Sequence, residues 1–239
     1  MSDISTHPSD QGHGEGYAAR ANKLRAGVLG ANDGIVSTAG LVLGVAAATT
    51  ERAPILTAGL AGLVAGAMSM AVGEYVSVST QRDTERALLA KEREELANDP
   101  HGELDELAMI YQSKGLTPEL AREVAVQLSQ DGNAFHAHAE AELGINPHEL
   151  VNPWGAAISS FISFTVGAAL PLVAILLAPP SARVPVTFAA MLLALVLTGS
   201  LSSRLGGAAP RRAIIRVVVG GALAMAITYG IGRLVGTAL

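Results

Sequence analysis

Apolar and polar positions along this 239-residue chain are grouped in long blocks rather than alternating. Three apolar runs carry no charged residue, at 55–73, 154–178 and 184–203. Two further runs are apolar except for one charge each, at 26–48 with Asp33 and at 213–232 with Arg216. About 20 mostly apolar residues are enough to cross a bilayer as a helix. The pattern therefore predicts five transmembrane helices.

A polar block interrupts the apolar runs between residues 82 and 151. It holds 15 of the 21 acidic residues and only six basic ones, which gives it a formal charge of −9. Residues 76–98 contain neither Gly nor Pro, so we expect the second span to continue as a helix into this block. Gly, Pro and Asn then separate three shorter predicted helices, at 103–113, 117–130 and 134–143. Thr117 followed by Pro118 is typical of a helix N-terminus.

These blocks divide the chain into four predicted parts. Residues 1–22 are polar, lack the apolar stretch of a signal peptide and are expected to form a disordered cytoplasmic tail. Residues 23–81 hold spans 1 and 2, residues 82–151 form a helical insert, and residues 152–239 hold spans 3 to 5. The prediction is an all-α polytopic membrane protein with five transmembrane helices and a helical domain between spans 2 and 3.

The distribution of Lys and Arg predicts the orientation of the chain in the membrane. Basic residues gather before span 1, after span 2 and between spans 4 and 5, and are sparse on the other side. Because Lys and Arg favour the cytoplasmic side, we expect the N-terminus and residues 82–151 in the cytosol and the C-terminus outside. Cysteine is absent, which excludes disulfides and thiolate metal sites.

The acidic insert carries carboxylates at spacings that suit a metal site. Glu92 and Glu95 share one helix face at i, i+3, and Glu103 and Glu106 repeat that spacing on the next predicted helix. A hairpin at residues 99–102 would bring the two pairs together. His138 and Glu142 form an i, i+4 pair farther on, and His136 and Glu140 form a weaker one. Carboxylate oxygens are ligands for hard cations, although a solvated acidic face would show the same spacing.

Asp33, Met70 and Glu74 are rarer signals because they lie in or beside the apolar runs. A carboxylate at bilayer depth costs about 2.5–3.5 kcal/mol and often marks an ion path; the alternative is that Asp33 only ends a helix near the surface. Met70 and Glu74 lie one turn apart on span 2 and offer a thioether beside a carboxylate. Three Gly-x-x-x-Gly pairs on spans 1 and 2, beginning at Gly30, Gly40 and Gly62, would allow close helix packing.

The motifs "GANDGIVSTAGLVLGVAAA", "AGLAGLVAGAMSMAVGEYVSVSTQRDTE" and "NPWGAAISSFISFTVGAALPLVA" closely resemble the vacuolar iron transporter family. The resemblance runs from about residue 23 to the C-terminus. It implies five spans, a homodimer with a metal path between the subunits, and export of Fe²⁺ or Mn²⁺ from the cytosol by proton antiport. It also implies that Asp33, Met70 and Glu74 belong to the transport path.

In family members with a cytosolic metal-binding domain, two Glu pairs and a later Glu before "LG" bind the ions. The resemblance therefore implies metal binding by Glu92, Glu95, Glu103, Glu106 and Glu142 of this chain. Where the family form has a Met pair before the last Glu, this chain has His138-Ala139. Imidazole still suits Fe²⁺ or Mn²⁺, and His138 joins the predicted ligands.

Two other function classes remain open at this point. A di-iron ferroxidase would need Glu-x-x-His pairs, and no Glu in the chain has a His three residues on. A metal sensor or buffer would use the spans only as an anchor and would not need Asp33. The expected partners are a second copy of the chain, divalent metal ions, protons and lipid, with no nucleic acid. No prosthetic group is expected, and the predicted location is a bacterial inner membrane.

Overall fold

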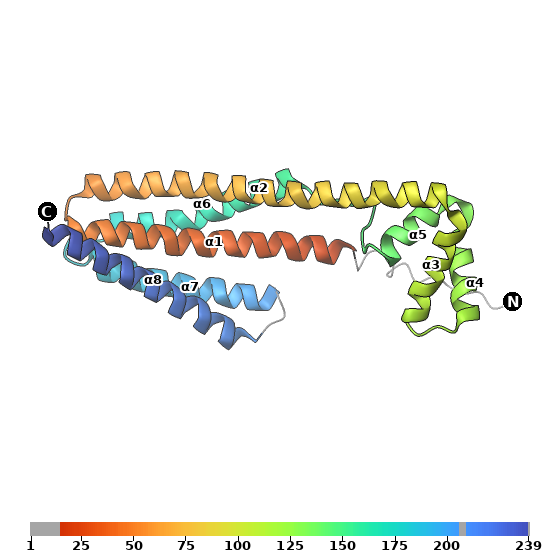
Figure 1. Cartoon of the computed structure of the whole chain (residues 1–239). Coiled ribbons are helices and arrows are strands. Elements are labelled where there is room, and N and C mark those ends of the chain that lie inside the picture. Colours follow the sequence, from red (N-terminus) through yellow and green to blue (C-terminus); the bar gives the residue numbers. More distant parts are fainter. Residues whose placement is uncertain (1–14, 206–208, 239) are drawn as a thin grey trace. The chain divides into compact units, whose positions relative to one another are not determined.

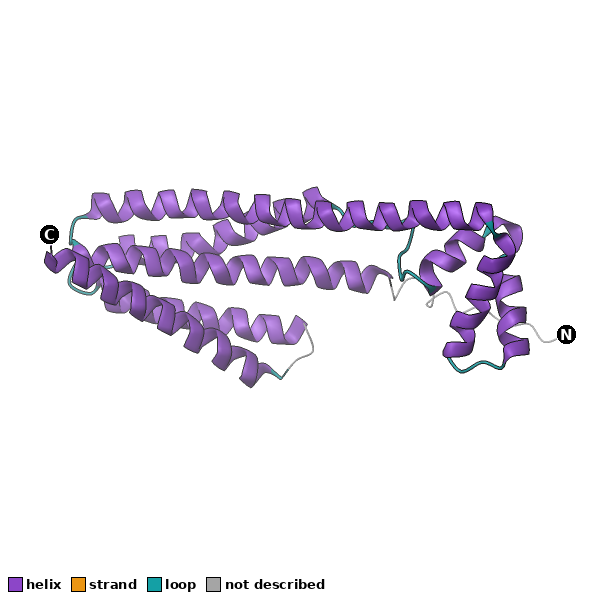
Figure 2. Cartoon of the chain, in the orientation of Figure 1, coloured by secondary structure: helices purple, strands orange, loops and turns teal. Residues whose placement is uncertain are grey.

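The computed structural model describes residues 15–205 and 209–238, and every regular element among them is a helix (Figure 2). Five of these helices are long and apolar enough to cross a membrane, as predicted. Figure 1 shows them as α1, α2, α6, α7 and α8. Their bounds are Glu15–Ala48 for α1, Arg52–Asn98 for α2, Pro153–Leu177 for α6, Arg183–Leu205 for α7 and Pro210–Ala238 for α8.

The chain forms two compact units. The first contains residues 1–75 and 154–239, and the second contains residues 76–153. In the first unit, α1 packs against both α7 and α8, which also pack against each other. The core of this unit is aliphatic and includes Ile35, Leu43, Ile175, Leu195 and Met225, all almost completely buried.

Glycine allows α1 and α6 to pack with their backbones in contact. A Cβ atom on Gly34 of α1 would collide with the carbonyl oxygen of Phe164 on α6. In the same way, a Cβ atom on Gly167 of α6 would collide with the carbonyl oxygen of Ala31 on α1. Small residues at helix contacts are typical of membrane bundles, where close packing takes the place of the hydrophobic effect. The Gly-x-x-x-Gly pair at Gly30 and Gly34 therefore has a packing partner within the subunit.

Helix α2 is continuous over 47 residues, so the prediction that span 2 runs on as a helix into the insert is confirmed. At 1.5 Å per residue it is about 70 Å long, more than twice the hydrocarbon thickness of a bilayer. Only its apolar part, residues 55–73, can serve as the span. Its second half, from Val76 onward, belongs to the second unit.

The second unit adds helices α3 at Pro100–Ser113, α4 at Pro118–Leu128 and α5 at Ala134–Ala141, with a 3₁₀ turn at Gln130–Gly132. Leu107, Ala108, Ala125 and Ala137 form its small apolar core. The predicted N-cap is confirmed, because the Thr117 hydroxyl accepts a hydrogen bond from the backbone N–H of Leu120 at 3.4 Å.

Two predicted boundaries need correction. The break between α2 and α3 was expected to occupy residues 99–102, but α3 already begins at Pro100. Asp99 caps this helix by accepting a hydrogen bond from Gly102 N at 2.9 Å, and Pro100 has the backbone angle of a first helical residue. The tail was expected to be disordered to residue 22, but α1 begins at Glu15. Residues 15–22 are rich in Ala and extend the following helix; residues 1–14 lie outside the described residues.

Candidate functional site

Three side chains of the second unit converge from three helices. Glu92 comes from α2, Glu103 from α3 and His138 from α5. The Nδ1 atom of His138 lies 3.1 Å from Oε1 of Glu92 and 3.6 Å from Oε2 of Glu103. Glu92 and His138 are almost completely buried, with 2% and 1% of their side chains exposed. We call these three residues the inner cluster.

Local packing explains how the three helices meet. The Asp99 cap makes the turn from α2 to α3 short, which places Glu103 near the end of α2. The guanidinium of Arg93 on α2 stacks over the ring of Phe135 on α5, 4.2 Å from its centroid. This cation–π contact links α5 to α2, and His138, with alanine on either side, is almost completely buried.

The two most buried side chains of the inner cluster face each other with poor hydrogen-bond geometry. Oε1 of Glu92 and Nδ1 of His138 lie 3.1 Å apart, yet neither atom makes a well-aligned hydrogen bond within the described part of the chain. Leaving a buried polar group unpaired costs about 1–3 kcal/mol. Ligand atoms of Glu92, Glu103 and His138 all lie within 4.8 Å of one another. Two ligands of one divalent ion, each about 2.1 Å from it, are at most about 4.2 Å apart. Small side-chain movements would therefore let a single cation satisfy all three.

Burial and crowding shift the protonation of this cluster, which lies beyond the apolar part of α2. Burial raises the pKa of Glu92 to about 7, helped by the nearby carboxylates of Glu142, Glu103, Glu95 and Glu106. Burial also raises the pKa of Glu103, with Glu106 as the next cause. The pKa of His138 is lowered because burial disfavours the imidazolium. A neutral imidazole is the form that binds metal, and a divalent cation would replace protons on the carboxylates.

The other three predicted ligands lie near the inner cluster, but only one of them is within reach of it. Oε2 of Glu142 lies 3.8 Å from Nδ1 of His138 and is the fourth group within reach. Glu95 forms an ion pair with Lys91 at 2.8 Å, and Glu106 is exposed. Both raise the pKa of Glu92 through their charge. The structure therefore brings four of the six predicted groups together and leaves Glu95 and Glu106 as nearby charges.

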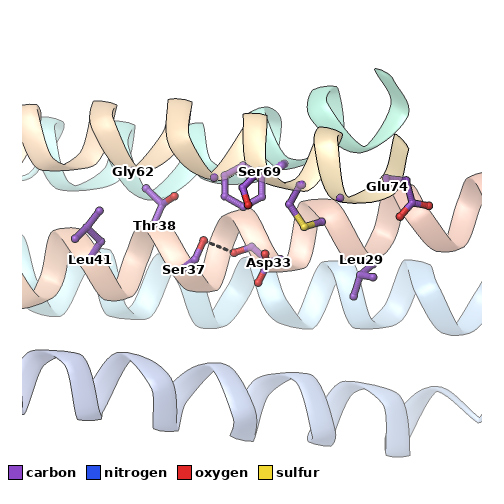
Figure 3. Close-up of a pocket in the computed structure, with 12 residues that line it drawn as sticks. Leu29, Asp33, Ser37, Thr38, Leu41, Gly62, Ser69 and Glu74 are labelled. Atoms are coloured by element: carbon purple, nitrogen blue, oxygen red, sulfur yellow. Dashed lines mark hydrogen bonds between the residues drawn. The ribbon is translucent and has the colours of Figure 1, made fainter. Parts of the chain in front are cut away.

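A second group of predicted residues lines one pocket in the first unit. Asp33 of α1 and both Met70 and Glu74 of α2 line a cavity of about 520 Å³ (Figure 3). Sequence reasoning missed three hydroxyl groups in the same wall, those of Ser37, Thr38 and Ser69. Ser37 follows Asp33 by four residues, which is one helical turn, and this spacing is the signal that could have found it. Thr38 and Ser69 carry no such signal in the sequence.

The neighbouring Ser37 hydroxyl does not occupy the Asp33 carboxylate. The hydroxyl of Ser37 donates a hydrogen bond to the backbone oxygen of Asp33 at 2.6 Å rather than to its side chain (Figure 3). Asp33 is exposed on the single chain, although it lies within the apolar part of α1. Large apolar side chains beside it are exposed as well, including Leu29 at 60%. A carboxylate at this position would be costly against lipid.

Comparison with known proteins identifies the family. The sequence pattern of the VIT family matches residues 24–233. The chain belongs to the VIT family. The matched range includes the residues of the inner cluster and those that line the pocket around Asp33. Since VIT proteins are transporters and not enzymes, membership also sets aside the ferroxidase hypothesis.

Three relatives support this assignment over most of the chain. A vacuolar iron transporter of Acanthamoeba castellanii is 45% identical over 221 residues, which are 90% of this chain and 79% of the relative. Vacuolar iron transporter homolog 1 of Oryza sativa subsp. japonica is 41% identical over 96% of this chain and 80% of its own length. Vacuolar iron transporter homolog 4 of Arabidopsis thaliana is 38% identical over 92% and 88%.

Proposed function

We propose that this VIT protein exports Fe²⁺ or Mn²⁺ from the cytosol in exchange for protons. The observation that carries the proposal is the pocket in which Asp33, Met70 and Glu74 meet within the membrane-spanning unit. A carboxylate and a thioether side by side suit Fe²⁺ or Mn²⁺. The relatives are also named as iron transporters or their homologues. A chain that only buffered metal would have no use for an acidic pocket between its spans.

The second unit is proposed to lie in the cytosol and to load the ion. Its net negative charge raises the local concentration of cations, and the inner cluster together with Glu142 binds them. Glu74 and Met70 then receive the ion, and Asp33 takes it deeper into the membrane. Because a carboxylate can hold either a metal ion or a proton, Asp33 provides a physical basis for antiport.

A homodimer is proposed because an exposed face that carries the Asp33 carboxylate would be costly in contact with lipid. Asp33 and Ser37 are both exposed on the single chain and line the pocket. A second copy that presents the same face would enclose two carboxylates near a two-fold axis and form a polar path between the subunits. The distribution of Lys and Arg and the odd number of spans support an orientation with the N-terminus in the cytosol and the C-terminus outside. The bacterial inner membrane stays the predicted location.

The decisive experiment compares wild type with Asp33→Asn in proteoliposomes that hold equal amounts of protein. The substitution keeps the size of the side chain and removes its charge and its titratable proton. We expect Fe²⁺ and Mn²⁺ flux, and the coupled change in lumenal pH, to fall at least about tenfold. Expression should hold or improve, because Asn costs less than Asp within a bilayer.

Ser37→Ala is the matched control, since it alters the same wall without removing charge. Wild-type flux with unchanged proton coupling in Asp33→Asn would show that Asp33 only ends a helix. Absence of flux in wild type, with intact metal binding by the inner cluster, would favour the sensor or buffer hypothesis.

A further inference from the structure

Helix α5 and its C-cap residue carry two His/Glu pairs, and one of these pairs shares His138 with the inner cluster. His138 and Glu142 form the first pair, and His136 and Glu140 form the second, each at i, i+4. Positions two residues apart on a helix differ in direction by about 200°, so the pairs lie on opposite faces. The burial agrees, because the side chain of His138 is 1% exposed and that of His136 is 31% exposed.

The second pair is completed by a residue from the segment after α5. The rings of His136 and His148 lie 5.6 Å apart between centroids, with their planes inclined at 31°. Nδ1 of His136 lies 3.7 Å from Oε2 of Glu140. The backbone N–H of His148 donates a hydrogen bond to Oδ1 of Asn146 at 2.9 Å, which fixes the local turn. Two imidazoles and one carboxylate are therefore neighbours on the outer face of α5, with His136 next to both of the others.

We propose that His136, Glu140 and His148 form a second, outer metal site that favours imidazole-binding ions such as Zn²⁺ over Mn²⁺. This site is separate from the inner cluster and from the transport path. It uses three of the groups that bind metals most often in proteins, and all three belong to the same compact unit.

One ligand pair already has the spacing of ligands on a common ion, and the third group would reach the same ion after rotation of the His148 ring. Ligand atoms about 2.1 Å from one ion are roughly 3–4 Å apart, and the 3.7 Å between Nδ1 of His136 and Oε2 of Glu140 lies in that range. An imidazole centroid lies about 3.2 Å from a bound ion, so two such rings are roughly 4.5–6.4 Å apart. The 5.6 Å between His136 and His148 is compatible with this arrangement after ring rotation. Partial exposure leaves room for water in the remaining coordination positions.

The donor set predicts which ion each site prefers. The inner cluster offers one buried and one partly buried carboxylate, with a third nearby, and one imidazole. The outer site offers two imidazoles and one carboxylate. Nitrogen-rich sites bind Zn²⁺ more tightly than Mn²⁺ by the general order of divalent stabilities. An ion at the outer site would also tie the segment around His148 to α5.

The test is calorimetric titration of the full-length protein in detergent with Zn²⁺ and, separately, with Mn²⁺. The variant His136→Phe/His148→Phe keeps both aromatic rings in contact and removes their ligand atoms. We expect it to lose one Zn²⁺ equivalent and to keep Mn²⁺ binding at the inner cluster. His101→Phe is the matched control, because His101 is an exposed histidine elsewhere in the same unit; it should keep every Zn²⁺ equivalent.

The inference is wrong if the double Phe variant and wild type bind the same number of Zn²⁺ equivalents, or if His101→Phe loses the same equivalent. Mn²⁺ flux in proteoliposomes is measured on the same variants. We expect it to stay at the wild-type rate, since the outer site lies off the proposed path. The Asp33→Asn experiment tests transport independently, so failure of one proposal does not imply failure of the other.

Discussion

Mn²⁺ binding by the inner cluster should strengthen as the pH rises from 6 to 8. The cause is Glu92, whose pKa is raised to about 7 by burial and by neighbouring carboxylates. A metal binds the carboxylate only after its proton has left. About one eleventh of Glu92 is ionised at pH 6 and about ten elevenths at pH 8, if its pKa is about 7. The apparent affinity should therefore rise about tenfold from this residue alone, and Glu103 adds to the effect in the same direction.

Isothermal titration calorimetry of the full-length protein in detergent measures both parts of this prediction. Titrations at pH 6, 7 and 8 give the change in affinity. Titrations at pH 7 in two buffers with different ionisation enthalpies give the number of protons released. Glu92 alone should release about half a proton per ion at pH 7. Because the pKa of His138 is lowered, this residue is largely neutral and contributes little between pH 7 and 8.

Two variants separate Glu92 from the rest of the acidic unit. Glu92→Gln should weaken Mn²⁺ binding and flatten its pH dependence. Glu94→Gln removes an exposed carboxylate from the same helix and should leave both unchanged. An affinity in wild type that varies less than about twofold from pH 6 to 8 would refute the reasoning. Full retention of the pH dependence in Glu92→Gln would refute it as well.

The same shift has the opposite sign for stability without metal. The folded state favours protonated Glu92, so the stability contributed by this group is present below its usual pKa of 4.5 and is lost as the pH rises through about 7. Thermal melting of the metal-free protein should therefore show a falling midpoint over that window. Saturating Mn²⁺ should reduce or reverse the fall, because the ion takes the place of the proton.

Three further predictions concern the cluster, the assembly and the helix contacts. Replacing Glu92, Glu95, Glu103 and Glu106 together by Gln should abolish high-affinity Mn²⁺ binding by the unit at 76–153 and slow flux without unfolding the spans. Calorimetry and flux assays check this, and undiminished Mn²⁺ binding would show that these residues are not the ligands. Single cysteines at positions 30–44 of this cysteine-free chain should cross-link between subunits on one helix face, and a transporting protein with no cross-link at any position would disprove the axial placement of Asp33. Gly34→Ala should destabilise the protein by about 1–3 kcal/mol through collision with the α6 backbone, whereas Gly73→Ala, with open space around it, should leave the melting temperature unchanged or raise it.

The sequence by itself determined the membrane spans and most helix ends. Apolar runs of about 20 residues can only be satisfied as helices in a bilayer, and the absence of Gly and Pro from residues 76–98 was enough to predict the continuous α2. The Thr117 cap could also be predicted from the sequence, because capping is an interaction between residues close together in the chain. The start of α3 was harder to predict, because Asp and Pro are common both in turns and at the first positions of helices.

Only the tertiary structure decided which predicted ligands meet. Glu92 and Glu95 share one helix face by spacing, yet Glu92 is buried against His138 whereas Glu95 turns to Lys91. Helical periodicity determines the direction in which a side chain leaves its helix, but not which residue of another helix it will contact. The burial that shifts the pKa of Glu92 and the meeting of Asp33 with Met70 in one pocket likewise depend on residues far apart in the chain. These features come from helix packing, which the spacing of residues along one helix does not specify.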